Sequence, residues 1–125
     1  NRKCLNEPDV IGVTDNLGFE NKVIAGMSMA EQMQYFSDID IACGPVGNNL
    51  LTMFAMQRGS RMVTYFPPQG AHIMAYYQSF CSALGVELYA ICGSGEYWDD
   101  PKRSLNSLRW EVDVDSVARV LGDLL

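Results

Sequence analysis

The sequence predicts an α/β fold, a Rossmann-like, doubly wound and mainly parallel sheet with helices on both faces. Two observations support this prediction. Segments with helical periodicity alternate along the chain with short strand-like segments, and such alternation is typical of parallel strands joined by right-handed crossovers. The 125 residues suffice for one domain with one core, and hydrophobic residues make up 48% of them, as in a packed globular interior.

The first third of the chain predicts a helix, a strand and a second helix. A helix is expected over 8–17, which has a proline near its start and a glycine after its end. Residues 19–24 are expected to form a strand. The next helix is expected over 28–37, because Ser28 can cap it and Glu31 can return the hydrogen bond.

The middle of the chain predicts a strand over 38–43, a sharp loop at 44–47 and a helix over about 49–57. A strand follows over 61–66 and ends at two prolines.

The last third predicts a helix over 72–84 with a glycine after it, and a strand over 86–92. Residues 93–112 lack clear periodicity and predict a long surface loop. A final helix is expected to begin at Asp113 or Asp115, either of which can cap it.

Composition excludes several classes of function. The formal net charge is −6, and an acidic surface repels phosphate backbones, so nucleic acid is a poor partner. The four cysteines form no C-x-x-C pair and His72 is the single histidine, which argues against a zinc site. No apolar run approaches 18 residues, so no membrane-spanning segment is expected.

The loop after the 38–43 strand is the strongest candidate for ligand binding. Gly44 and Gly47 allow a close backbone approach, and the helix that follows offers free N–H groups. That combination suits a diphosphate, and Asn48 and Asn49 add amide groups for hydroxyls. A tight turn with Asn48 as a simple helix cap explains the same residues equally well.

Taken together, the segments resemble glycosyltransferase family 61, in order and over nearly the whole chain. The family has an Arg followed by Leu-Asn-Glu, a Glu-Gln pair in a helix, a strand ending in Gly-Pro-His-Gly-Ala-Gly-Leu, a strand ending in Phe-Pro, and a Tyr-rich helix leading to Leu-Gly. The matching positions here are Arg2 to Glu7, Glu31-Gln32, Gly44 to Leu50, Phe66-Pro67, Tyr76-Tyr77 and Leu84-Gly85.

The resemblance implies a GT-B architecture, in which two Rossmann-like domains face each other across a cleft. Residues 1–125 would be the single nucleotide-sugar-binding domain, and an N-terminal domain of the same protein would be its partner and carry the general base. It also implies sugar transfer from a nucleotide sugar to a glycan or glycoprotein acceptor, with no bound metal or other cofactor. The implied donor-binding residues are Arg2, Asn6, Gly44, Pro45, Gly47, Asn48, Asn49, Leu50 and Thr64.

Three departures from the family pattern keep other functions open. The family's histidine is Val46, its small Ala-Gly pair is Asn48-Asn49, and Thr64 stands where an acidic residue is expected. These changes favour a catalytically inactive sugar-nucleotide or glycan-binding module, or a structural α/β domain, as alternatives.

The resemblance carries two further expectations. The location would be cytoplasmic or membrane-associated in a bacterium, and the Golgi or endoplasmic reticulum lumen in a eukaryote. The family fold would place another strand before Asn1, which predicts an exposed sheet edge or apolar surface near Leu5 and Val23 and self-association of this chain.

Overall fold

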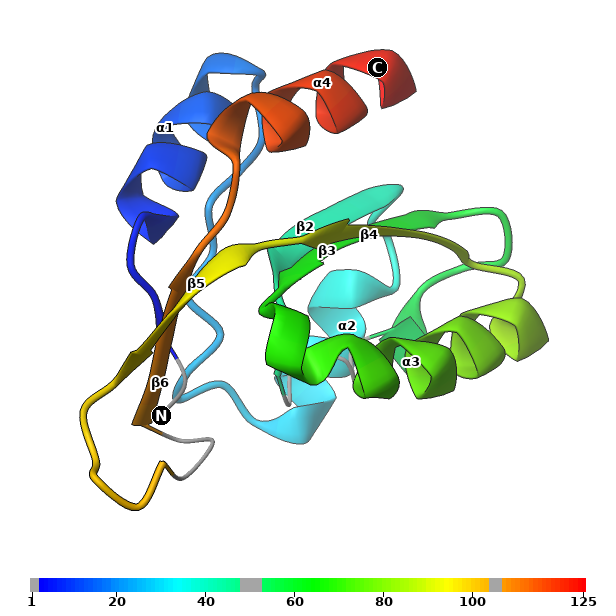
Figure 1. The fold of residues 1–125 in the computed structure, drawn as a ribbon. Coiled ribbons are helices and arrows are strands. Elements are labelled where there is room, and N and C mark those ends of the chain that lie inside the picture. Colours follow the sequence, from blue (N-terminus) through cyan, green and yellow to red (C-terminus); the bar gives the residue numbers. More distant parts are fainter. Residues whose placement is uncertain (1–2, 48–52, 104–106) are drawn as a thin grey trace.

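The structure is a computed structural model that describes residues 3–47, 53–103 and 107–125 (Figure 1). Within these residues the strands form two three-stranded sheets. Sheet A has the order β1-β6-β5. In it β1 (Lys3–Cys4) runs parallel to β6 (Leu108–Glu111), and β5 (Ser94–Trp98) runs antiparallel to β6.

Sheet B is parallel throughout and has the order β2-β3-β4. Its strands are β2 (Ile41–Pro45), β3 (Arg61–Phe66) and β4 (Glu87–Cys92). The register places Gly44 of β2 beside Thr64 of β3. Paired residues of neighbouring strands share one face of a sheet, so the position without a side chain lies next to the threonine.

In the part of the chain that the structure describes, four α-helices accompany the sheets: α1 (Glu7–Asn16), α2 (Met29–Phe36), α3 (Ala71–Leu84) and α4 (Val114–Leu124). A short 3-10 helix, Pro68–Gly70, leads into α3. Figure 1 shows α1 and α4 side by side, apart from α2 and α3. All four α-helices were predicted from the sequence within one or two residues at each end.

Two of the predicted helix caps are confirmed. The backbone N–H of Glu31 donates to the Ser28 hydroxyl at 3.1 Å, and the Ser28 N–H donates to the Glu31 carboxylate at 3.1 Å. Asp113 caps α4 by accepting from the N–H of Asp115 at 3.2 Å. These caps stabilise the first turns, because the N–H groups there have no partner within the helix.

The predicted doubly wound sheet is wrong. The chain forms a small α/β domain with a mixed sheet A and a parallel sheet B, not one Rossmann-like sheet with helices on both faces. Residues 19–24, predicted as a strand, pair with no described strand. Residues 93–112, predicted as a loop, contain β5 and β6, and β6 pairs with β1 from the start of the chain. Local periodicity does not reveal such distant partners.

The predicted helix over 49–57 falls partly on residues 48–52, which lie outside the described residues. Residues 53–55 form a single 3-10 turn. The strands predicted over 61–66 and 86–92 are confirmed as β3 and β4.

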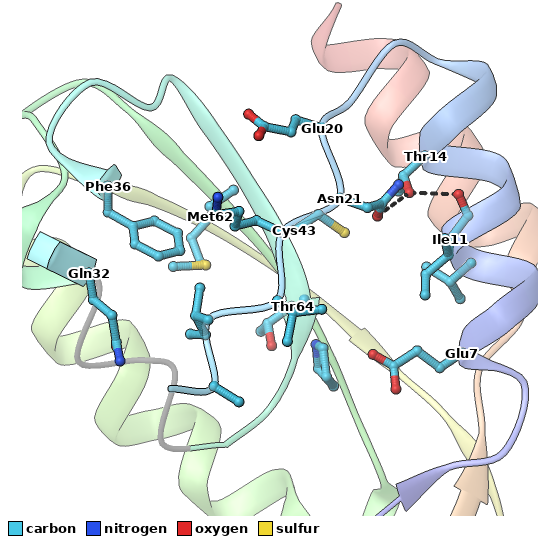
Figure 2. Close-up of a pocket in the computed structure, with 18 of the residues that line it drawn as sticks. Glu7, Ile11, Thr14, Glu20, Asn21, Gln32, Phe36, Cys43, Met62 and Thr64 are labelled. Atoms are coloured by element: carbon cyan, nitrogen blue, oxygen red, sulfur yellow. Dashed lines mark hydrogen bonds between the residues drawn. The ribbon is translucent and has the colours of Figure 1, made fainter. Parts of the chain in front are cut away.

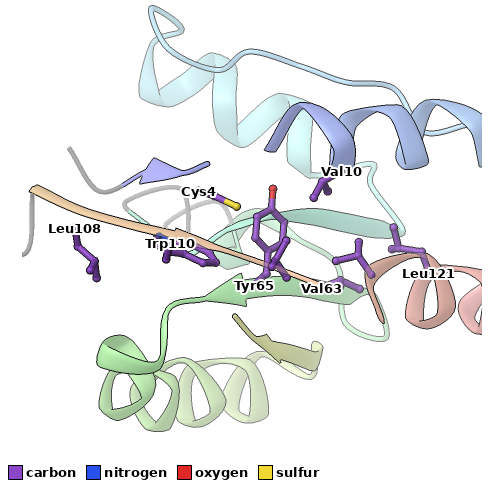
Figure 3. Close-up of a cluster of buried hydrophobic side chains, with 9 residues drawn as sticks. Cys4, Val10, Val63, Tyr65, Leu108, Trp110 and Leu121 are labelled. Atoms are coloured by element: carbon purple, nitrogen blue, oxygen red, sulfur yellow. The ribbon is translucent and has the colours of Figure 1, made fainter. Parts of the chain in front are cut away.

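The core consists of two clusters, because successive side chains of β3 point to opposite sides. Figure 3 shows the first, in which Val63 and Tyr65 pack with residues of α1, α4 and sheet A. Its other buried members are Cys4, Val10, Leu108, Trp110, Val112, Val117 and Leu121. Met62 and Phe66 belong to the second cluster, with Ala42, Val46, Met53, Met56, Cys81 and Val86. Sheet B therefore divides two separate packing regions.

Candidate ligand-binding site

A cavity of about 660 Å³ opens beside β2, and we call it the β2 cavity. Figure 2 shows α1 on one side, α2 on the other and the extended segment 20–26 crossing between them. Strands β2 and β3 supply the residues Ala42, Cys43, Gly44, Pro45, Met62, Thr64 and Tyr65. Ligand pockets in proteins usually measure about 300–1,000 Å³, so the β2 cavity is large enough for a small molecule.

Thr64 is the most informative residue in this cavity. Its side chain is only 1% exposed, and its hydroxyl oxygen has no hydrogen-bond partner among the described residues. A Cβ added at the neighbouring Gly44 would meet no atom within 4 Å, so open space lies there. An unpaired buried hydroxyl costs about 1–3 kcal/mol, and a polar ligand in this space would remove that cost.

Glu7 lines the cavity from α1, on the face of sheet B that carries Cys43 and Tyr65. It lies in the first turn of α1 and is half-buried, and Figure 2 shows its carboxylate directed toward β2. Burial raises the pKa of the Tyr65 phenol far above its usual range, and the negative charge of Glu7 raises this pKa further. Tyr65 therefore stays protonated and neutral beside the carboxylate.

Cys43 adds a thiol to the cavity. Burial raises the pKa of this thiol to about 12, so at neutral pH it carries no charge and is a poor nucleophile.

The segment 20–26 is fastened to both flanking helices. Asn21 donates to the Asp15 carboxylate, and its side-chain oxygen lies 3.1 Å from the Thr14 hydroxyl of α1. On the other side, the Tyr35 hydroxyl of α2 donates to Glu20 at 3.1 Å. These contacts hold the segment across the cavity as a strap, although Val23 within it is 80% exposed.

The fold brings together three of the residues predicted from the sequence to bind a donor. Gly44, Pro45 and Thr64 all line the β2 cavity. Gly47 follows β2 but does not line the cavity, and its carbonyl oxygen accepts from the Tyr77 hydroxyl at 3.5 Å. Arg2, Asn48, Asn49 and Leu50 lie outside the described residues.

Asn6 has a different place in the structure. Its side-chain N–H donates to the Val112 carbonyl at 2.7 Å, and its side-chain oxygen accepts from the Val112 N–H at 3.0 Å. Both ends of the amide are therefore used to join the start of α1 to the end of β6. Asn6 is absent from the described lining of the cavity.

Sequence reasoning missed Glu7 and Cys43 as cavity residues. The motif Leu-Asn-Glu contains Glu7, but nothing in its spacing shows that it faces β3, more than fifty residues later. Val46, where the family has histidine, is buried in the second core cluster. Its side chain packs with other apolar groups.

The fold is a small α/β domain with a ligand-sized, partly polar cavity. Residues 1–63 match the family model described as Glycosyltransferase 61. The match covers half of the chain, including α1, the strap, α2 and β2. The chain therefore belongs to glycosyltransferase family 61. A search of curated proteins found no match.

None of the helices among the described residues combines the length and the apolar character needed to cross a membrane. In the same part of the chain, no group of three or more His, Cys, Asp or Glu side chains is placed to hold a metal ion.

Proposed function

We propose that this chain forms the nucleotide-sugar donor site of a glycosyltransferase, and that the β2 cavity is part of that site. Family membership identifies the chain as a glycosyltransferase, and such enzymes act on a sugar donor and an acceptor. The proposal assigns donor binding to residues 1–125 as one unit. A glycan or glycoprotein is the proposed acceptor, and the donor is bound without a metal.

The unpaired hydroxyl of Thr64 carries this proposal. It is buried, lacks a partner among the described residues and lies beside the open space at Gly44. Pro45 and Gly44 line the same cavity, at the strand end where the sequence places a glycine-rich loop. Backbone N–H groups in such loops bind phosphate oxygens, so we assign the diphosphate to the loop that contains Gly47 and the remainder of the donor to the cavity.

A pair of glycine substitutions tests where the donor binds. An added Cβ meets no atom within 4 Å at either Gly44 or Gly12, but only Gly44 lines the cavity. Thermal-shift and calorimetric titrations with uridine, guanosine and cytidine nucleotide sugars should show binding to the natural chain. Gly44→Ala should reduce donor affinity about tenfold or more through collision with the ligand, whereas Gly12→Ala should bind normally. Equal donor affinity in the two variants would contradict the proposed location.

Thr64→Val separates the effect on folding from the effect on binding. Valine has nearly the same shape as threonine but no hydroxyl. The free energy of unfolding of the variant should therefore be about 1–3 kcal/mol higher, which makes the variant more stable than the natural chain. Its donor affinity should fall, since the ligand loses a hydrogen-bond partner. A less stable Thr64→Val variant in urea unfolding would show that the hydroxyl has a partner in the folded chain and would remove the main support for the proposal.

A second function, donor binding without sugar transfer, is favoured by one observation. Val46 takes the place of the family's histidine and is buried in the second core cluster, so this position offers no proton-transfer group. Release of nucleotide from the donor in the presence of glycan acceptors would support transfer. Donor binding with no release, in the intact protein, would support the binding module.

A further inference from the structure

A long stretch of the chain carries almost no charge. Residues 62–95 contain one charged side chain, Glu87, although Asp, Glu, Lys and Arg make up 19% of the chain. This stretch includes the whole of α3 and β4, which both lie within the described residues. Cys81 is the one buried residue of α3, and no residue of β4 is buried. Helix faces in contact with water usually carry charged residues, whereas the centres of protein interfaces are depleted of them, so this surface is typical of an interface.

Strand β4 lies at the edge of sheet B, and every second residue turns its backbone groups away from the sheet. The N–H groups of Glu87 and Gly93 donate to carbonyls in or next to β3, at 3.0 and 2.7 Å. Because backbone groups alternate between the two sides of a strand, those of Leu88, Ala90 and Cys92 point outward. Ala90 and Cys92 are also exposed. An exposed, apolar edge of this kind is a template for pairing with another strand.

A groove of about 510 Å³ lies between α3 and the edge of β4. Figure 1 shows α3 along one face of sheet B. Helix α3 contributes Gln78 and Ser82, whose side chains are joined by a hydrogen bond of 3.0 Å, and β4 contributes Glu87, Leu88 and Tyr89. The Glu87 carboxylate accepts from the Tyr89 hydroxyl at 2.8 Å. The groove therefore continues the nearly uncharged surface from the helix to the strand edge.

Charge and symmetry favour a second copy of this chain as the partner. The net charge of −6 makes two copies repel each other, and this repulsion is weakest where the facing surfaces are uncharged. Two identical edge strands in antiparallel pairing are self-complementary, because every contact occurs twice. If the pairing is centred on Ala90, the two Glu87 side chains are six residues apart, about 20 Å. That separation exceeds the Debye length of about 8 Å at physiological salt.

We propose that two copies of this chain associate through β4, with the strands antiparallel and centred on Ala90. Leu88 of one copy then lies opposite Cys92 of the other, and the outward backbone groups form hydrogen bonds between the copies. The two three-stranded B sheets become one continuous sheet, and the two α3 helices lie on the same face of it. The β2 cavities lie at the outer ends of this sheet, so the association goes beyond the proposed donor function and does not depend on it.

A cross-linking experiment tests the pairing and its centre. Ala90→Cys, combined with Cys92→Ser, places two thiols directly opposite each other. The Cα atoms of such a hydrogen-bonded antiparallel pair are about 5.5 Å apart, which a disulfide can span. Oxidised glutathione should therefore link this variant into a covalent dimer and take up the two electrons released. The control is Ala30→Cys with Cys92→Ser, because Ala30 is exposed on α2, and it should stay monomeric on a non-reducing gel.

The natural Cys92 provides a check on the register. In the proposed pairing the two Cys92 residues are four positions apart along the strands, about 14 Å, which is too far for a disulfide. The natural chain should therefore form no cross-link under the same oxidation. Efficient linking through Cys92 would contradict a pairing that is centred on Ala90.

Sedimentation equilibrium measures the association without a cross-link. Between about 1 μM and 1 mM, the natural chain should change from monomer to dimer. Ala90→Glu places two carboxylates opposite each other and should weaken the dimer about tenfold or more. Ala30→Glu adds the same charge at an exposed position of α2 and should associate as the natural chain does. Melting temperatures show whether both variants are folded.

Three results would overturn the inference. A natural chain that stays monomeric at every concentration would reject the dimer. A dimer that Ala90→Glu does not weaken would have another interface, such as the exposed surface near Leu5 and Val23. Equal cross-linking of the Ala90→Cys and Ala30→Cys variants would show random collision. If Ala90→Glu does not fold, the cross-linking comparison alone decides the outcome.

Discussion

Polar side chains in the interior of this domain are of two kinds: those whose hydrogen bonds hold the fold, and those without a hydrogen-bond partner among the described residues. Asn6 represents the first kind, because its amide forms two hydrogen bonds with the backbone of Val112. Thr64 represents the second, since its hydroxyl is buried and unpaired among the described residues. A paired group stabilises the fold at no further cost, whereas an unpaired one is destabilising unless a ligand completes it.

At the scale of single residues, we expect Asn6→Ala to destabilise the domain. The substitution removes both hydrogen bonds and leaves the N–H and carbonyl of Val112 unpaired, which should cost about 1–3 kcal/mol in the free energy of unfolding. Urea unfolding measures this cost. The control is Asn16→Ala, because Asn16 is exposed at the end of α1 and should change stability by about 0.5 kcal/mol or less. Equal losses in the two variants would show that the contact with Val112 contributes nothing.

The junction between strands β4 and β5 decides how the two sheets meet. Gly93 is the one residue between them, and its N–H donates to the Phe66 carbonyl at 2.7 Å. A Cβ at this position would collide with the backbone carbonyl of Glu111 and would lie 2.7 Å from the ring of Trp110. The chain can pass from sheet B to sheet A here because the residue has no side chain.

At the scale of elements, Gly93→Ala should therefore destabilise the domain by about 1–3 kcal/mol, since β4 and β6 must move apart. The comparison is Gly122→Ala within α4, where an added Cβ meets no atom within 4 Å. That change should stabilise by about 0.5–1 kcal/mol through higher helix propensity. Thermal and urea unfolding measure both values. If Gly93→Ala unfolds as the natural chain does, the close contact of the sheets at this point is not present.

The whole molecule contains buried acidic groups that keep their protons. Burial raises the pKa values of Cys43, Tyr65, Cys4 and Cys81, and the pKa of Cys43 reaches about 12 from a usual value of 9.0. Above pH 9 the unfolded chain loses the Cys43 proton while the folded chain retains it. The folded state then binds more protons, so the free energy of unfolding falls as the pH rises, until about pH 12.

At the scale of the whole molecule, the domain should lose stability steadily above about pH 9, by about 1.4 kcal/mol per pH unit for each such group. Urea unfolding between about pH 8 and pH 10.5 measures the slope. Cys43→Ala should make the slope shallower, because one titrating group is removed. Cys92→Ala should leave it unchanged, since Cys92 is exposed. A slope that Cys43→Ala does not alter would place the Cys43 thiol in contact with water.

The sequence by itself determined the four α-helices of the described residues and strands β3 and β4, whereas β2 begins three residues later and ends two residues later than the strand predicted over 38–43. The Ser28 cap, the glycine after α3 and the prolines that end β3 are local signals, because their effects act within a few residues. The glycine-rich end of β2 and Thr64 were also identified as a candidate site, and both belong to the β2 cavity.

Only the tertiary structure decided which strands pair and which side chains face each other. The 19–24 segment was predicted as a strand, but it is tied to α1 and α2 by Asn21 and Glu20 and pairs with no described strand. The segment 93–112 shows no clear period, yet it contains β5 and β6, because Gly93 lets the chain cross between the sheets and β1 offers a parallel partner. Glu7 comes near Tyr65 for the same reason: strand pairing and helix packing join residues that are distant in the sequence, and local patterns carry no record of those partners.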